Sequence, residues 1–507
     1  MAYITPIGSN PEQVEYRLGI GHGCTGPGAT DRQFSYHADG RERPLRWIGR
    51  ALADLGIEAG TELTPERFDT ARALMRGVDP RTGEVLVEAK RGIPDDAKVS
   101  LSPLVRAVQA LAEEAAVPVA EVLGHRVKLV AAFEAARRAV ARKGDSAQLR
   151  ADEAGTLVDA AGLSVEAVWG EDVYARAAAN LFETRVVRLP DGTVTEERIP
   201  RRVIVGNAGY DVTFTLPKSL SLLLAFADEE TAAAVERIYM EQVERTFGWL
   251  EETTAYGMRG QHGQGRTAET VKGNGYAGWV MVHRAARPVA GAEVGDPHWH
   301  VHATVANMTK GTDGKWSTVA AGGRDLMRHA AAVDHMLKAM VRDELGRRYG
   351  IRFGRNARTG AWEAAGIPDE ALRLFSKRHA DIKEMLTALG YDEATATRAQ
   401  DRIAEQRSRG AKGEAVAAAD ATLQHLWQGE ELATGRDPAE HLRRVMNGGR
   451  DPDDPATGTG PQPEGPTGPD RGAPPAAERA TEPAGGERSR GELVTRAREV
   501  ERYHDTT

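Results

Sequence analysis

Apolar and polar residues alternate along much of the segment from about residue 201 to 435, and this pattern predicts β-strands there. The clearest runs are 209–216 (GYDVTFTL), 275–287 (GYAGWVMVHRAAR) and the histidine-rich 298–302 (HWHVH). Every second side chain of a strand lies on the same face. The segment 286–297 contains Gly, Asp and Pro, which favour a hairpin turn or a longer loop. We therefore expect the second and third runs to lie side by side as antiparallel strands.

The stretch from about residue 90 to 200 has a different pattern, because its apolar residues recur at three- and four-residue spacing. It is also rich in Ala, Leu, Glu and Arg, which favour helices. We predict that this stretch is mostly helical, and it contains no obvious chemical cluster. The first 90 residues predict a strand at 2–7 and a short helix at 11–18.

The C-terminal part from about residue 448 to 490 is dense in Pro, Gly, Thr and acidic residues and has almost no large apolar residue. Such a segment cannot bury enough surface to offset the entropy lost on ordering. We predict an ordered domain over residues 1–435 and a disordered tail over 436–507, with a short helix at 492–503. No internal repeat of 20 to 50 residues and no GxxxxGK[ST] phosphate loop is visible.

Composition indicates an ordinary globular protein, with 41% hydrophobic and 28% charged residues among 507. No apolar run approaches the roughly 18 residues that cross a bilayer, and no secretory signal is visible, so we expect no membrane insertion. The only cysteine, Cys24, cannot form an intramolecular disulfide, which fits a cytoplasmic protein. The Arg, Ala and Gly bias suggests a bacterial source with a GC-rich genome. The net charge of −8 argues against a protein that coats nucleic acid, so any DNA contact must be local.

The three histidines of the run HWHVH are the strongest chemical signal. His298, His300 and His302 would project from one face of the strand, with Trp299 and Val301 on the packed face. A solvent-facing strand that happens to be rich in His is the alternative. Three alternating histidines make that alternative less probable than it is for a single His-X-His.

His283 ends the alternating run before the loop and would lie against the histidine strand. A single histidine is more often packed or solvated than a ligand, so His283 gains its meaning from this pairing. Two adjacent strands can thus present three imidazoles to one divalent ion. A site with only imidazole ligands leaves coordination positions open for a substrate oxygen, as catalytic metals require.

The strand predicted at 209–216 places Asp211, Thr213 and Thr215 on one face. Asp211 could orient or deprotonate a neighbouring hydroxyl, although a lone Asp at a strand end is usually solvated. The chain then turns into a helix near Lys218 and Ser219. A Lys and a hydroxyl at a helix start form either a phosphate-binding corner or an ordinary N-cap.

The order and spacing of these motifs resemble the relaxase domain of TrwC/TraI-type (MobF class) conjugative relaxases, which belong to the HUH endonucleases. The resemblance rests on GYDVTFTLPKSLSLL, VMVHRAAR, DPHWHVHATVANMTKGTDGKW and LFSKR at residues 374–378, and it extends over about 230 residues, with a weaker match in the first 90. It implies an α/β (α+β) fold with an antiparallel, palm-like sheet flanked by helices. It also makes the helical stretch at about 90–200 an insertion.

The resemblance implies that His283, His300 and His302 bind a divalent metal and that His298 does not. The metal would be Mg or Mn first, with Zn, Ni or Co possible, since imidazole ligands suit the latter and Mg prefers oxygen. Asp211 falls on the family's acidic residue.

The resemblance places a nucleophilic Tyr near the N-terminus, and we favour Tyr16, with Tyr36 as the second candidate. This Tyr would attack single-stranded DNA at a transfer origin, leaving a 5′-phosphotyrosine and a free 3′-OH. Candidate DNA or phosphate contacts are Lys218, Ser219, Arg287, Lys377 and Arg378. The chain departs from the family in three ways: it has single Tyr residues where the family often has Tyr-Tyr pairs, a wider gap after Tyr16, and the insertion.

The expected partners are single-stranded DNA at the transfer origin and, by family analogy, a type IV secretion coupling protein and accessory DNA-binding proteins. A helicase encoded separately is a further possible partner, because no phosphate loop is present. The alternatives are a rolling-circle replication initiator, a His-site metal hydrolase or oxygenase, and a DNA-binding protein without catalysis. The last is disfavoured by the intact histidine set and Tyr16.

Overall fold

The computed structural model of the chain describes residues 3–450 except 19–43, 189–192, 261–266, 287, 290, 291, 293, 393, 394 and 408–419. The chain divides into a first unit, residues 1–454, and a second, residues 455–507, which lies outside the described residues. Tyr36, Arg287, the tail after residue 450 and the helix predicted at 492–503 lie outside the described residues. No helix in the described part is long and apolar enough to cross a membrane.

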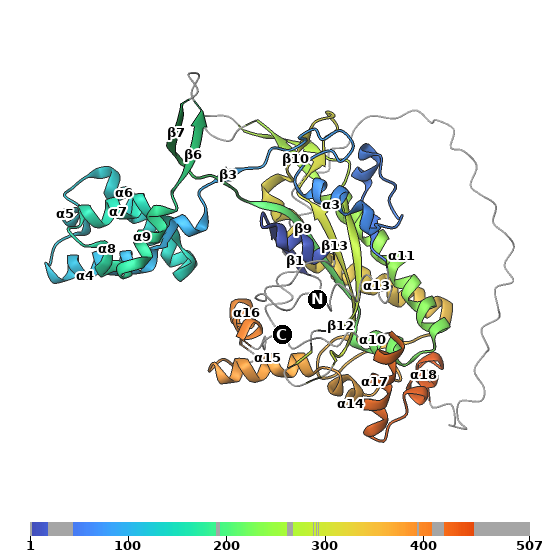
Figure 1. Cartoon of the computed structure of the whole chain (residues 1–507). Helices are drawn as coiled ribbons and strands as arrows, with labels where there is room; N and C mark the ends of the chain where they lie inside the picture. Colours follow the sequence, from blue (N-terminus) through green and yellow to red (C-terminus); the bar gives the residue numbers. More distant parts are fainter. Residues whose placement is uncertain are drawn as a thin grey trace, which may run out of the picture. The chain divides into compact units, whose positions relative to one another are not determined.

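A five-stranded antiparallel sheet forms the centre of the first unit (Figure 1). Its strands, in spatial order, are β1 (Tyr3–Gly8), β9 (Asn207–Thr215), β13 (Pro297–Ala306), β12 (Gly278–Ala285) and β2 (Arg46–Ile48). The strands predicted from alternation are therefore confirmed, and so is the pairing of the histidine strand with the strand that precedes it. The sequence did not indicate the edge strand β2.

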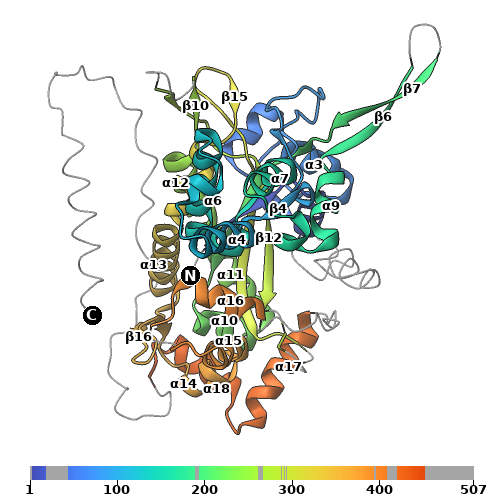
Figure 2. The same ribbon diagram turned by 90° about the vertical axis from the view of Figure 1, so that its left-hand side faces the viewer.

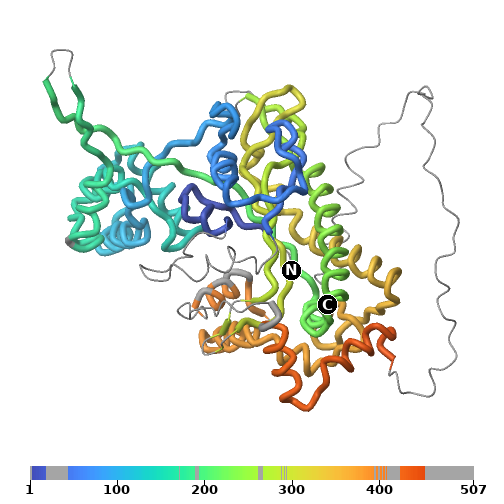
Figure 3. The backbone as a smooth tube through the Cα atoms, turned by 45° about the vertical axis from the view of Figure 1, so that its right-hand side comes forward, coloured from blue at the N-terminus to red at the C-terminus, as the bar shows by residue number. Residues whose placement is uncertain are grey.

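One face of the sheet is apolar and packs against helices. Val212, Phe214, Val301 and Val305 are fully buried there. They contact α10 (Lys218–Phe226), α11 (Glu229–Thr254) and α13 (Ala330–Tyr349), and Figure 3 shows α11 and α13 running side by side. Burial of each large apolar side chain contributes about 1.5–3 kcal/mol, so this layer fixes the sheet on its helices.

The opposite face of the sheet is divided into an apolar and a polar part. A second apolar cluster covers one end, where Trp47 and Trp279 pack against Val14 and Leu18. It includes α1 (Pro11–Arg17), the 3-10 helix η1 (Arg50–Leu55) and α3 (Phe68–Met75). The rest of this face carries His, Asp and Thr side chains and is the candidate site.

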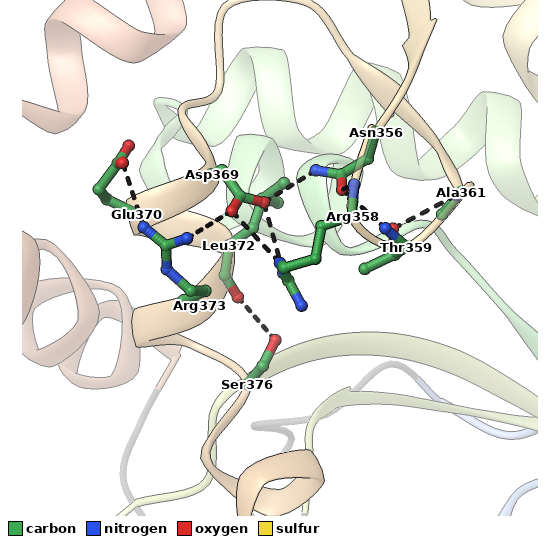
Figure 4. A network of polar contacts seen from close by, with 9 residues as sticks. All are labelled: Asn356, Arg358, Thr359, Ala361, Asp369, Glu370, Leu372, Arg373 and Ser376. Carbon is green, nitrogen blue, oxygen red and sulfur yellow. Dashed lines mark hydrogen bonds and ion pairs between the residues drawn. The ribbon is translucent and has the colours of Figure 1, made fainter. Parts of the chain in front are cut away.

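Further helices and short hairpins follow the sheet strands. They are β10 (Tyr256–Arg259), β11 (Glu269–Lys272), β14 (Thr309–Lys310), β15 (Trp316–Ser317), α12 (Arg324–Arg328), β16 (Phe353–Arg355), β17 (Trp362–Ala364), α14 (Asp369–Leu374), α15 (Lys377–Ala388) and α16 (Arg398–Arg407). Asp369 joins α14 to the β16–β17 loop, because its carboxylate accepts from Asn356 (2.8 Å) and from Arg358, as well as from Arg373 (2.7 Å; Figure 4).

The compact unit continues past residue 435, where the sequence predicted the domain to end. Helices α17 (Asp420–Ala433) and α18 (Pro438–Met446) follow, and Val445 is fully buried in the main core. The buried Glu431 accepts from Arg436 (2.6 Å) and from His441 (2.9 Å). These contacts make α18 part of the folded unit.

The inserted stretch contains a helical module, residues 98–181, with a hydrophobic cluster of its own. Its helices are α4 (Leu101–Glu114), α5 (Val119–Val122), α6 (Val127–Lys143), α7 (Ala151–Ala160), α8 (Val165–Trp169) and α9 (Glu171–Ala179). The helical prediction is thus confirmed for the module and wrong for residues 182–200. There β6 (Phe182–Arg188) and β7 (Val194–Pro200) pair as an antiparallel ribbon (Figure 2), which suits their β-branched residues.

The helical module has two halves with the same order of elements. β4 (Lys98–Ser100) precedes α4, α5 and α6, and β5 (Gln148–Arg150) precedes α7, α8 and α9. The two strands pair with each other, and the Trp169 indole donates to the Ser100 carbonyl (2.8 Å). The sequence showed no internal repeat because the halves share little beyond small and apolar positions.

Because the helical module has a core of its own, Phe133→Ala is expected to loosen it alone. Loss of this buried ring costs about 3–5 kcal/mol. Hydrogen exchange followed by mass spectrometry should show faster exchange over residues 98–181 and unchanged exchange in β9, β12 and β13. Phe247→Ala in α11 is the matched control and should give the reverse pattern; faster exchange throughout in both variants would show that the module and the sheet unfold together.

Candidate functional site

The register of three neighbouring strands assembles the polar face of the sheet. His283 of β12 lies opposite His300 of β13, and Met281 lies opposite His302. On the other side of β13, His302 lies opposite Thr213 of β9. Opposed residues of an antiparallel pair project to the same face, so the three histidines and Thr213 share one surface.

The side chains of His283, His300 and His302 converge on one point. One nitrogen of each ring lies within 4.8 Å of the corresponding atoms of the other two. His283 Nδ1 and His300 Nε2 are 3.3 Å apart. Two nitrogen lone pairs at this distance repel unless a proton or a cation lies between them. The geometry therefore fits a divalent metal with three imidazole ligands.

Hydrogen bonds on the far sides of two rings set their tautomers. His300 Nδ1 lies 2.8 Å from the carbonyl oxygen of His298, which can only accept, so Nδ1 carries the proton. His302 Nδ1 lies 2.9 and 3.0 Å from the two carboxylate oxygens of Asp211 and donates in the same way. Both rings thus keep Nε2 unprotonated for a metal. Burial lowers the pKa of His300 to about 4, which keeps this ring neutral at pH 7.

Asp211 connects the histidines to the first helix of the chain. Its side chain is almost completely buried, and Arg17 contacts it through Nε and Nη2, both at 3.2 Å. Burial opposes ionisation of Asp211, but the interactions with His302 and Arg17 outweigh it, so the pKa lies below the usual value. The carboxylate therefore stays ionised and holds the His302 ring.

His298 remains outside the converging group. Its ring stacks on His300, with 4.9 Å between centroids, and only its backbone carbonyl takes part in orienting a triad member. Burial lowers the pKa of His298 well below its usual value, as do the nearby His300 and Lys218. The structure thus brings together the three histidines that the family resemblance selected.

Helix α1, which carries Tyr16, is fixed to the site on both sides of that residue. Glu15 accepts from Arg72 of α3 at 2.7 Å. The backbone carbonyl of Arg17 accepts from the Trp279 indole at 2.8 Å. Tyr16 therefore lies between two anchored neighbours, one of which contacts Asp211. Tyr36, the second candidate nucleophile, lies outside the described residues.

Lys218 and Ser219 start α10, as the sequence predicted, but both are engaged. Lys218 donates to the carbonyl of Pro297 (2.8 Å), and burial lowers its pKa to about 8. The Ser219 N–H donates to Glu363 (2.8 Å), and its buried hydroxyl accepts from Ala364 N–H. A protein carboxylate thus occupies the start of this helix, and the phosphate-binding role of these residues stays a prediction.

Lys377 and Arg378 begin α15 and also make contacts within the protein. The buried Asp296 carboxylate accepts from the Lys377 N–H (2.7 Å) and from its ammonium group (3.0 Å). Arg378 donates to the carbonyl of Glu405 (3.0 Å). The bonds to Asp296 tie α15 to the start of the histidine strand, and the bond to Glu405 ties it to α16. The DNA contacts predicted for Lys377 and Arg378 stay predictions, and Arg287 lies outside the described residues.

The sequence prediction missed two residues of the site. Arg17 links α1 to Asp211, and Trp279 binds the Arg17 carbonyl from the neighbouring strand. The available signal for Arg17 was a cation directly after the candidate nucleophile. For Trp279 it was an aromatic residue four positions before His283, on the same face of its strand.

Replacement of a converging histidine should strongly weaken metal binding. We expect His300→Ala to weaken Mn²⁺ or Zn²⁺ affinity by at least about 100-fold, because two imidazoles hold a divalent ion poorly. Titration calorimetry measures this affinity directly. His298→Ala is the matched control on the same strand and should keep affinity within about threefold; equal losses in both variants would contradict the three-histidine geometry.

Comparison with known proteins finds similar sequences and structures. The chain is 27% identical to the multifunctional conjugation protein TraI of Escherichia coli over 217 residues, which are 42% of this chain and 11% of TraI. TraI of strain K12 is 26% identical over the same length, so the chain spans a small part of these relatives.

A solved structure of similar fold, a copper-bound complex of the conjugative relaxase TrwC with oriT DNA, gives a TM-score of 0.50 at 17% identity. The match covers 86% of this chain and all of that one. Residues 24–433 match the TrwC relaxase family, which is most of the chain. The chain belongs to the TrwC relaxase family.

Proposed function

We propose that the chain is a metal-dependent relaxase that nicks single-stranded DNA at a transfer origin and rejoins it during conjugative transfer. The observation that carries the proposal is the continuous set of contacts from the histidine triad through Asp211 to Arg17, the neighbour of Tyr16. Membership of the TrwC relaxase family supports it.

His283, His300 and His302 are the residues that would hold the metal. When bound, the ion polarises the scissile phosphate and neutralises charge that develops on it. We propose Mn²⁺ or Mg²⁺ as the physiological ion, with Zn²⁺, Ni²⁺ and Co²⁺ as alternatives, since three imidazoles also suit these. The TrwC complex of similar fold is copper-bound, which supports a transition metal as an alternative ion for this chain.

Tyr16 is proposed to be the nucleophile. Its phenolic oxygen forms a bond to phosphorus while the bond from phosphorus to the 3′ oxygen breaks. The phenol gives up its proton and the departing 3′ oxygen takes one up, so the step needs no net proton. The product is a 5′-phosphotyrosine and a 3′-OH, and attack by a 3′-OH reverses the step without ATP.

Asp211 is proposed to position His302 rather than to act as the base. Its two oxygens already accept from His302 and Arg17, and its lowered pKa makes it a weak proton acceptor. Arg17 then has a positioning role, because it holds the helix of the nucleophile against the carboxylate that orients a metal ligand.

The proposed substrate is single-stranded DNA at the transfer origin of a plasmid or integrative element, in the cytoplasm of a bacterium. A type IV secretion coupling protein, accessory DNA-binding proteins and a helicase supplied by another chain are proposed as partners. Support for them is the conjugation function named for TraI and TrwC.

Tyr16→Phe should abolish the covalent adduct with DNA, since phenylalanine has no oxygen to attack phosphorus. The protein is incubated with Mn²⁺ and a labelled single-stranded oligonucleotide from the transfer-origin region next to its gene. Denaturing electrophoresis then separates the covalent adduct from unreacted DNA. Tyr36→Phe is the comparison and should still form the adduct. Loss of the adduct only in Tyr36→Phe would make Tyr36 the nucleophile instead of Tyr16. If the wild-type protein cleaves no oligonucleotide with any divalent metal, the relaxase proposal is wrong.

Arg17→Ala should slow single-turnover nicking by about 10- to 100-fold, because a small displacement of a nucleophile costs this much. Metal affinity should change far less than in His300→Ala, because the triad itself remains. Arg17→Lys should recover part of the rate by keeping the charge. The exposed Arg76 serves as control, and Arg76→Ala should nick at the wild-type rate; a normal rate in Arg17→Ala would exclude the positioning role.

A further inference from the structure

The helical module segregates its charges along the chain. Residues 126–143, which form α6 and its N-cap, contain six Lys and Arg and a single acid, Glu134. Residues 144–181 contain seven Asp and Glu and only two Arg. The chain as a whole is acidic, with a net charge of −8. Helix α6 is therefore a local basic surface on an acidic protein.

The two halves of the module show that its fold does not require this basic helix. Helix α6 contacts α4 and α5, and α9 contacts α7 and α8 in the corresponding places. Yet α9 carries Glu171 and Asp172 with Arg176 as its one cation. The second half thus folds with an acidic helix in third place, so packing in this module does not by itself require a basic third helix.

The cations of α6 include three that share its outward face. Phe133 marks the buried side and is completely inaccessible. At 100° per residue, Lys128, Arg138 and Arg142 lie within about 80° of one another on the opposite side. All three are exposed. We call these three residues the basic face of α6.

The basic face is not neutralised by the protein. In the part of the chain that the structure describes, Lys128, Arg138 and Arg142 form no ion pair, whereas the flanking Arg137 pairs with Glu134 at 2.8 Å. By the helical spacing, the small residues between the three cations are alanines, which let a large ligand approach closely. An uncompensated row of cations of this kind favours a polyanion.

We propose that the basic face of α6 binds the phosphate backbone of double-stranded DNA. Lys128 and Arg142 are about 21 Å apart along the helix axis, and a duplex presents about 12 phosphates over that length. The proposed contacts go to phosphate oxygens, which carry no sequence information, so we expect the face to bind duplexes of any sequence. The inference concerns a surface outside the nicking site and rests on the proposed function of the chain as a nicking enzyme that acts on DNA.

The test measures binding of the full-length protein to a 30-base-pair duplex of unrelated sequence at several salt concentrations. The variant Lys128→Gln/Arg138→Gln/Arg142→Gln removes the face while keeping good helix formers. We expect about 10- to 100-fold weaker binding at 0.1 M salt and a slope of log affinity against log salt that is smaller by about three. Circular dichroism confirms that the variant is folded.

The matched control removes three other cations of the same segment, in Arg126→Gln/Arg137→Gln/Lys143→Gln. It should lose less than about threefold in affinity, since these residues flank the basic face. Equal losses of affinity in both variants would contradict binding by the basic face in particular. Wild-type affinity in the first variant would exclude DNA as the ligand of the basic face and would favour an acidic partner protein instead. Nicking of a short single-stranded oligonucleotide should be unchanged in both, so failure of this inference is separate from failure of the proposed function.

Discussion

The antiparallel register between β12 and β13 is the constraint on which the site depends. It sets His283 opposite His300 and thereby supplies the third imidazole from a second strand. Because side chains alternate between faces, a slip of one residue would turn the histidines into the apolar core and bring Trp299 and Val301 out of it. The burial of these two residues against the helices therefore fixes the metal site on the other side of the same strand.

Hydrogen bonds convert this register into a defined ligand set. The backbone carbonyl of His298 and the carboxylate of Asp211 each accept a hydrogen bond from the Nδ1–H of one ring, which leaves Nε2 of His300 and His302 unprotonated and able to bind a metal. Asp211 is in turn held by Arg17. A buried carboxylate with two donors is better satisfied than one with a single donor, since burial of an unpaired charge is costly. The same contact that stabilises Asp211 thus holds α1, which carries the proposed nucleophile Tyr16, against the histidine triad.

Much of this site could be predicted from the sequence because it depends on local alternation. The faces of β9, β12 and β13 follow from period-two patterns, and the loop between β12 and β13 implied their pairing. The partner of Arg17 could not be predicted, because its contact with Asp211 spans 194 residues and depends on how α1 packs. The sequence did not predict the ribbon β6–β7 because its charged residues also fit a helix. Pairing between the two strands, which the sequence pattern does not show, selects the strand conformation. The domain does not end at residue 435 because α18 packs into the main core through Val445. The composition of this segment does not reveal that contact.

Net charge is a poor guide to local DNA contacts in this chain, because the basic and acidic residues of the helical module lie in different segments of the sequence. Screening limits electrostatic interaction to about 10 Å at 0.1 M salt, so a bound polyanion responds to the charges near it and not to the whole-chain sum. The candidate site on the sheet would need few cations, since a bound metal would supply charge at the phosphate. Binding along a duplex has no such aid and requires a row of side chains. A module whose core is independent of the sheet can carry that row without altering the register on which the metal site depends.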